Sequence, residues 1–156
     1  MTEQDLAGRR ALVTGGASGI GLACVREFAS RGAHVTIADL DATGAQTVAD
    51  EVGGEAWVVD LGDTHALESL RLDVDILVNN AGLQRVSPLP EFAPEQWRLL
   101  HRIMLEAPFL LIRAALPRMY ERGWGRIINL SSVHGLRASA YKSAYVSAKH
   151  GLEGLS

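Results

Sequence analysis

The pattern that most restricts the fold lies in the first thirty residues: a short apolar run, a glycine-rich turn and an amphipathic stretch. The run at residues 11–14 is compatible with a β-strand, and the turn extends from Gly15 to Gly21. Residues 22–31 then show helical periodicity, which ends at Gly32. A strand that passes through glycines directly into a helix is typical of the first unit of a parallel α/β sheet.

The rest of the chain repeats this alternation of strands and helices. Further strands are expected at residues 33–38, 56–59, 76–78 and 126–130, and helices at about residues 42–52, 65–70 and 94–121. Pro108 and Pro117 fall within the longest helical stretch, and we expect them to kink or divide it. Such alternation implies parallel strands joined by right-handed helical crossovers.

Composition excludes several classes of function. The chain has 156 residues, a net charge of -3 and 47% hydrophobic residues, which fits one globular domain and argues against nucleic acid or an anionic membrane as partner. The single cysteine, Cys24, and a polar N-terminus without an apolar run predict a cytoplasmic protein. Because the chain stops at Ser156 inside a helical pattern, we expect residues 1–156 to form a single domain that is incomplete at its C-terminus.

The glycine turn has the features of a dinucleotide site. Glycines at this place let the backbone approach a pyrophosphate, and the following helix offers free N–H groups and the positive end of its dipole. Asp39 ends the second predicted strand, where a carboxylate can accept hydrogen bonds from both adenosine ribose hydroxyls and would repel a 2′-phosphate. This favours NAD over NADP, although an ordinary turn aspartate remains an alternative.

Near the end of the chain, Tyr145 and Lys149 stand one helical turn apart on the same face. A phenol titrates near pH 10 and needs a stabilised anion to act as an acid or base at neutral pH. A cation about 4.5 Å away, at an effective dielectric of about 20, supplies roughly 3.7 kcal/mol toward that anion. The alternative is a chance pairing, but both lysines of the chain lie in this one segment.

Four motifs in the same order resemble the classical short-chain dehydrogenase/reductase family. They are Thr14-Gly15-x-x-x-Gly19-Ile20-Gly21, Asn79-Asn80-Ala81-Gly82, Ser132, and Tyr145-x-x-x-Lys149, with Ser132 thirteen residues before Tyr145. The resemblance covers nearly the whole chain. It implies a Rossmann-type doubly wound sheet with about five strands present in the order 3-2-1-4-5, the C-terminal strands of the family being absent.

The resemblance also implies roles for individual residues. Tyr145 would exchange a proton with the substrate oxygen, Ser132 would hold and polarise that oxygen, and Lys149 would bind the nicotinamide ribose and favour the Tyr145 anion. The residues that match the family's NAD-binding positions are Gly15, Ser18, Gly19, Ile20, Gly21, Asp39, Asp60, Leu61, Asn80, Ala81, Gly82, Tyr145 and Lys149. Asn79 and Asn80 could equally serve a structural turn.

The sequence around Ser132 and Tyr145 resembles that of the 3-hydroxybutyrate dehydrogenase branch of the family. In that branch the residues matching Gln84, His134 and Lys142 hold the substrate carboxylate, which suits a cation combined with neutral donors. The alternative is that Lys142 and His134 are ordinary loop residues. Met104 stands where the family often has an asparagine, so the proton relay to solvent is expected to be absent or to follow another route.

We therefore expect an enzyme that transfers hydride between NAD and a short 3-hydroxy acid, most simply 3-hydroxybutyrate. Two alternatives stay open: another alcohol, a sugar or an acyl thioester as substrate, and an NAD-binding fragment without turnover. The histidines show no ligand spacing with cysteines or carboxylates, so no metal is predicted. The resemblance further suggests a homotetramer.

Overall fold

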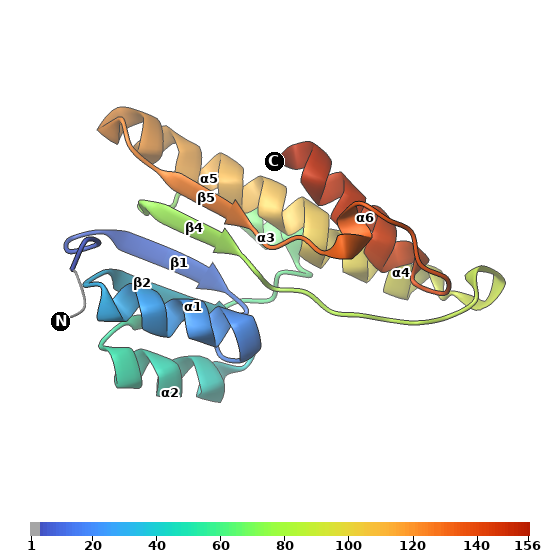
Figure 1. The fold of residues 1–156 in the computed structure, drawn as a ribbon, viewed down its shortest axis with the longest axis horizontal. Coiled ribbons are helices and arrows are strands. Elements are labelled where there is room, and N and C mark those ends of the chain that lie inside the picture. The colour runs from blue at the N-terminus through green and yellow to red at the C-terminus, as the bar shows by residue number, and fades with distance from the viewer. Residues whose placement is uncertain (1–3) are drawn as a thin grey trace.

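The computed structural model describes residues 4–156, which form a parallel sheet of five strands in the order β3-β2-β1-β4-β5 (Figure 1). This confirms the predicted fold class and strand order. The strands are β1 (Arg10–Thr14), β2 (His34–Asp39), β3 (Glu55–Val58), β4 (Ile76–Asn79) and β5 (Arg126–Asn129). The ends of all five strands differ from the sequence-based expectation by one residue or less.

β1 occupies the centre of the sheet and pairs with a strand on each side. Val13 lies opposite Ile37 of β2 and opposite Val78 of β4. The chain runs outward from β1 through β2 to β3, and then crosses back to place β4 on the other side of β1. This change of direction between β1 and β4 is the point at which open α/β sheets bind their ligands, at the carboxyl ends of the strands.

Helices cover the two faces of the sheet, as expected for a parallel sheet. Figure 1 shows α1 (Gly19–Ser30) and α2 (Ala42–Val52) on one side and α5 (Ala107–Arg122) on the other. The side chains of β1 alternate between the two layers: Ala11 and Val13 pack with the α1/α2 layer, whereas Leu12 packs with α5 and with the short helix α3 (Thr64–Leu67). Each face therefore has its own apolar core.

The long helical stretch is divided, but mainly at one of its two prolines. It consists of α4 (Pro94–His101), a π-helical segment at Arg102–Glu106, and α5. Pro108 lies two residues after the last residue of the π segment, and because proline has no N–H it cannot make the regular bond to the carbonyl four residues earlier. α5 continues through Pro117 without a break and ends at Gly123, whose φ of 64° is left-handed.

The C-terminal helix α6 (Ser143–Leu155) follows a short 3₁₀ turn at Val133–Gly135. It packs on α4 and on the π segment, where Ala144 and Ala148 meet Leu100 and Met104 in a third small core. Small residues on α6 let the two helices approach closely. None of the helices in the described part of the chain is both long and apolar enough to cross a membrane.

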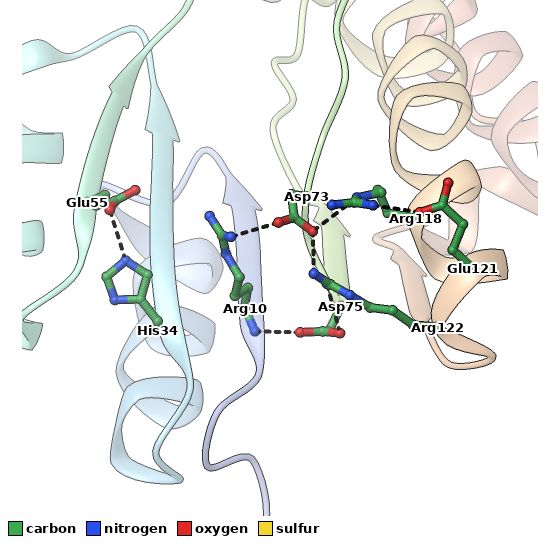
Figure 2. A network of polar contacts seen from close by, with 8 residues as sticks. All are labelled: Arg10, His34, Glu55, Asp73, Asp75, Arg118, Glu121 and Arg122. Atoms are coloured by element: carbon green, nitrogen blue, oxygen red, sulfur yellow. Dashed lines mark hydrogen bonds and ion pairs between the residues drawn. The ribbon is translucent and has the colours of Figure 1, made fainter.

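A network of ion pairs joins the strands at their amino ends. Figure 2 shows Asp73 and Asp75 between Arg10 on one side and Arg118 and Arg122 on the other. Asp75 is only 4% exposed, and its Oδ2 accepts a hydrogen bond from the Arg10 backbone N–H at 2.9 Å. Its Oδ1 lies 3.3 Å from the Arg122 guanidinium. Asp75 thus links β1, β4 and α5.

Replacing Asp75 by alanine should lower the free energy of unfolding by about 2 kcal/mol, because the Arg10 N–H loses its acceptor and the Arg122 guanidinium keeps only Asp73. Urea denaturation measures this loss. Asp75→Asn keeps an oxygen acceptor and should be less destabilising. Glu51→Gln, which removes an exposed partner of Arg26, is the surface control. Equal losses for Asp75→Ala and Glu51→Gln would contradict the linking role of Asp75.

Candidate active site

A cavity opens at the carboxyl ends of the strands, at the β1/β4 switch point. It has a volume of about 400 Å³ and is lined by Gly15, Ser18, Ile20, Ala38, Asp39, Leu40, Val59, Asp60, Leu61, Asn80, Ala81, Gly82, Leu83 and Ile103. Most of the residues assigned from the sequence to cofactor binding are in this lining. Gly19 and Gly21 belong to the same turn without lining the cavity, and Tyr145 and Lys149 lie on α6.

Thr14 joins the ends of β1 and β4 at the base of this cavity. Its hydroxyl oxygen accepts hydrogen bonds from the backbone N–H groups of Asn80, at 3.0 Å, and Ala81, at 3.1 Å, and lies 3.3 Å from the Val78 carbonyl to which it donates. The Asn80 side-chain amide donates to the carbonyls of Thr14 and Gly15. The two glycine-containing segments are therefore held at a fixed separation across the switch point.

Gly21 is required for this close approach. A Cβ at Gly21 would lie 2.1 Å from the Gly15 carbonyl oxygen and 2.6 Å from the Asn80 amide nitrogen, which no side chain can accommodate. Ser18 precedes α1 but makes no side-chain capping bond, and the first turn contains no acidic residue. The N–H groups at the start of α1 thus remain free, which suits the pyrophosphate of a dinucleotide.

Two carboxylates border the cavity beside the glycine turn. Asp39 is half-buried; one of its oxygens accepts the Ala17 N–H at 3.0 Å and the other accepts the Asp41 N–H at 3.1 Å. A carboxylate has about four acceptor positions, so both oxygens can still accept hydroxyl donors. Asp60 is exposed and accepts the Gly62 N–H at 2.7 Å. The residues present therefore fit the ribose and phosphate groups of a dinucleotide.

Tyr145 and Lys149 lie together on α6, as their spacing predicts. The Lys149 ammonium is 5.7 Å from the centre of the Tyr145 ring and donates to the Leu130 carbonyl at the end of β5. Lys149 is only 5% exposed, and this burial lowers its pKa from the usual value, because desolvation disfavours the charged form. The ammonium uses one donor on Leu130 and has two more for a ligand.

Ser132 and His134 lie in the turn that precedes α6, and Lys142 is the residue just before that helix. The Ser132 hydroxyl oxygen accepts the His134 N–H at 3.2 Å, which leaves its own proton available to a ligand. The Lys142 ammonium lies 3.2 Å from His134 Nε2, and the His134 ring stands edge-on to the Tyr145 ring with 6.0 Å between centres. The structure therefore brings His134, Lys142 and Tyr145 together.

Gln84, the third residue that we expect to hold the carboxylate, lies exposed in the segment after β4, and within the described residues it makes no hydrogen bond. Met104, in contrast, is 1% exposed and packs in the core beneath α6; its sulfur would lie 3.3 Å from a Cβ added at Gly82. A thioether at this buried position fills space and is at most a weak hydrogen-bond acceptor.

Several cavity residues escape sequence reasoning. Leu40 and Val59 are apolar residues at strand ends, 69% exposed in the case of Leu40, and their position beside Asp39 and Asp60 is the one sequence signal that could have found them. Ile103 comes from the π segment, which apolar periodicity does not predict. Thr14 is part of the first motif, but the hydrogen bonds of its hydroxyl are visible only in three dimensions.

A family model described as short chain dehydrogenase matches residues 9–156. The chain belongs to the short-chain dehydrogenase family. Among its curated relatives are two proteins named D-beta-hydroxybutyrate dehydrogenase, one from Rhizobium meliloti strain 1021 and one from Cupriavidus necator H16. They are 43% and 42% identical to this chain over 94% and 96% of its length. The chain spans 62% of the length of either relative.

Other short-chain dehydrogenases of similar likeness have different names. The 3-oxoacyl-[acyl-carrier-protein] reductase FabG of Escherichia coli K12 is 35% identical over 96% of the chain, which spans 65% of that protein. A crystal structure titled as an NAD(P)-dependent gluconate 5-dehydrogenase from Beutenbergia cavernae, with bound NADP, superposes with a TM-score of 0.88 at 37% identity. The match covers 97% of this chain and 65% of that one. The family is thus established, whereas its members differ in substrate.

Gly21→Ala should raise the dissociation constant for NAD at least about tenfold and lower stability by about 1–3 kcal/mol, because the new methyl group displaces the Gly15 carbonyl. Calorimetric titration with NAD and urea denaturation measure the two effects. Gly154→Ala is the matched control, since a Cβ there meets no atom within 4 Å. If Gly21→Ala binds NAD as the control does, the turn is not the binding site.

Lys149→Met should make the chain more stable near pH 7, and this advantage should shrink as the pH rises toward 10.5. Because burial lowers the pKa of Lys149, the unfolded chain binds more protons between the folded and unfolded pKa values, so wild-type stability rises with pH there. Urea denaturation at pH 7 and pH 10 tests this. Arg85→Met, which removes an exposed charge, controls for general charge effects. A constant advantage at both pH values would contradict the burial argument.

Proposed function

We propose that the protein to which this chain belongs interconverts a short 3-hydroxy acid and its 3-oxo acid, with NAD as cofactor. The observation that carries the proposal is the grouping of Lys142, His134 and Tyr145, with 3.2 Å between the Lys142 ammonium and His134 Nε2. A cation and a neutral imidazole next to a phenol can hold a carboxylate while the phenol serves the hydroxyl of the same small molecule. The two relatives named D-beta-hydroxybutyrate dehydrogenase support 3-hydroxybutyrate as the substrate.

Each catalytic residue has a distinct task in this proposal. The Ser132 hydroxyl donates a hydrogen bond to the substrate oxygen and so fixes that oxygen beside Tyr145. Tyr145 removes the hydroxyl proton during oxidation and returns it during reduction. When bound, NAD accepts the hydride that leaves the carbinol carbon. The two remaining donors of Lys149 hold the ribose on the nicotinamide side, and its positive charge favours the anionic form of the neighbouring phenol.

The choice of NAD rests on Asp39. Its carboxylate faces the cavity beside the glycine turn, and a 2′-phosphate at the same place would meet a negative charge. Residues 15–18, which form the rest of this corner, contain no lysine or arginine to offset that charge. The related structure with bound NADP makes NADP the natural competitor in any test.

Two alternative functions predict different results when the same protein is assayed. FabG of E. coli and the gluconate 5-dehydrogenase from B. cavernae are comparably similar to the chain, which supports an acyl thioester or a sugar acid as alternative substrate. The chain also spans only 62% of its hydroxybutyrate dehydrogenase relatives, which supports an NAD-binding fragment without turnover. The cavity that we assign to NAD is formed entirely by residues of this chain, so the fragment would still bind the nucleotide.

Assembly into a homotetramer is part of the proposal. It is supported by an open apolar groove between the π segment, α5 and α6, lined by Leu105, Glu106, Phe109, Gly151, Gly154 and Leu155. Phe109 in this groove is 48% exposed, and a partner subunit seated in the groove would bury it. Cytoplasmic location is likewise retained as a prediction.

Incubation with NAD and 3-hydroxybutyrate should form NADH, and Tyr145→Phe should abolish this while leaving NAD binding intact. Lys142→Ala and His134→Ala should each raise KM for the acid about tenfold or more with a smaller change in kcat, because they remove carboxylate binding. Absorbance at the NADH band and calorimetry measure turnover and binding. NAD binding without turnover on any acid, sugar or thioester substrate would favour the fragment, and unchanged KM values in both variants would rule out the carboxylate site.

Wild-type protein should bind NAD at least about tenfold more tightly than NADP, because the Asp39 carboxylate repels the 2′-phosphate. Asp39→Asn removes the charge but keeps an oxygen that accepts the Ala17 N–H, so it should narrow this difference by improving NADP binding. Asp41→Asn, two residues further along the chain at the start of α2, is the matched charge control, because asparagine can still accept the Gly44 N–H. Equal affinity of the wild type for both nucleotides would contradict the NAD assignment.

A further inference from the structure

Tyr141 has an unusual backbone conformation in the loop before α6. Its φ of 63° makes it the one non-glycine residue with a positive φ among the residues that the structure describes. Residues with a Cβ disfavour this left-handed region, and tyrosine lacks the short polar side chain that lets asparagine or aspartate adopt it. The Tyr141 side chain is 60% exposed, so packing of the ring does not hold the backbone in this state.

Hydrogen bonds hold the chain before and after Tyr141. Before it, the turn that carries His134 is closed by the Arg137 N–H, which donates to the Val133 carbonyl at 2.9 Å. After it, the Tyr141 carbonyl accepts the Ser87 N–H at 2.9 Å, and the carbonyl of Lys142, the residue that caps α6, accepts the Val146 N–H at 2.9 Å. Tyr141 therefore makes the turn between the His134 turn and the start of α6.

This turn determines where the Lys142 side chain goes. The dihedral angles of one residue rotate everything that follows it relative to everything before it, so an extended Tyr141 could not keep both the His134 turn and the Ser87 hydrogen bond in place. With the turn in place, the Lys142 ammonium lies 3.2 Å from His134 Nε2. Backbone strain held in place by surrounding structure is characteristic of functional sites.

We propose that Tyr141 is a positioning residue for the substrate: its left-handed backbone aims the Lys142 ammonium at His134 and so builds the carboxylate-binding pair. The proposal rests on the function proposed above, and it goes further by assigning specificity to a backbone conformation rather than to a side chain that touches the ligand. The Tyr141 phenol takes no part, because the ring is exposed and the backbone alone makes the contacts.

The pairing also involves a specific atom of His134. An ammonium has only hydrogens to donate, so Nε2 is the acceptor in this contact, whereas Nδ1 is buried and has no partner among the described residues. The remaining Lys142 donors stay available to a carboxylate. Moving Lys142 away would free Nε2 and would change the nitrogen resonance of the ring, which gives a readout that does not require turnover.

Four variants at residue 141 separate backbone from side chain. Tyr141→Gly and Tyr141→Asn accept a left-handed backbone, Tyr141→Phe removes only the hydroxyl, and Tyr141→Val strongly disfavours the left-handed region because it is β-branched. Leu136→Val is the matched control, since Leu136 is 74% exposed in the same loop and has an ordinary φ of -117°. Each variant is compared with the wild type for KM and kcat toward 3-hydroxybutyrate, for the His134 Nε2 resonance, and for hydrogen exchange of the Ser87 amide.

Tyr141→Val should raise KM for 3-hydroxybutyrate about tenfold with kcat within about twofold, shift the Nε2 resonance and speed exchange of the Ser87 amide. The glycine, asparagine and phenylalanine variants and the control should keep wild-type values in all three. A wild type without turnover would defeat the proposed function, and the resonance and exchange would then decide the positioning role. A valine variant with wild-type resonance and exchange, or with wild-type KM in an active enzyme, would overturn the inference.

Discussion

The geometry of the site depends on one buried hydroxyl at the centre of the sheet. Thr14 Oγ1 accepts the N–H groups of Asn80 and Ala81 at the place where β1 and β4 separate, and Thr14 is 1% exposed. Two segments that are more than sixty residues apart in the chain are thereby held side by side. Without such a connection, the ends of β1 and β4 would diverge, and the proposed nucleotide site would be bordered on one side only.

A second connection holds the catalytic helix against the sheet. Lys149 donates to the Leu130 carbonyl, and Asn129 Nδ2 donates to the Ser156 hydroxyl at 2.9 Å, so α6 is attached to the end of β5 in two places. Lys149 thus combines a structural bond with the positive charge that the proposed chemistry requires. Burial of that charge costs stability, because desolvation disfavours the ammonium. If Lys149 has the proposed role, this cost is a trade of stability for activity.

The sequence was sufficient for the fold because its signals were local and consistent. Glycine turns, apolar runs and the Gly32 and Gly123 stops located every strand and the main helices, and the parallel order followed from the family resemblance. Tyr145 and Lys149 were placed correctly relative to each other because they share one helix, where spacing determines the face. Sequence reasoning missed the π segment before Pro108 and the long-range bond from Ser87 to Tyr141, which no local pattern indicates.

The ion-pair network around Asp75 lies at the amino ends of the strands, whereas the cavity opens at their carboxyl ends. The residues that hold the strands together are therefore different from the residues that line the cavity. The strands themselves connect the two groups. A substitution in a loop at the carboxyl ends leaves the arginine–aspartate contacts in place. Under the proposed function, the residues that select the acid could therefore change while the contacts that hold the strands together remain.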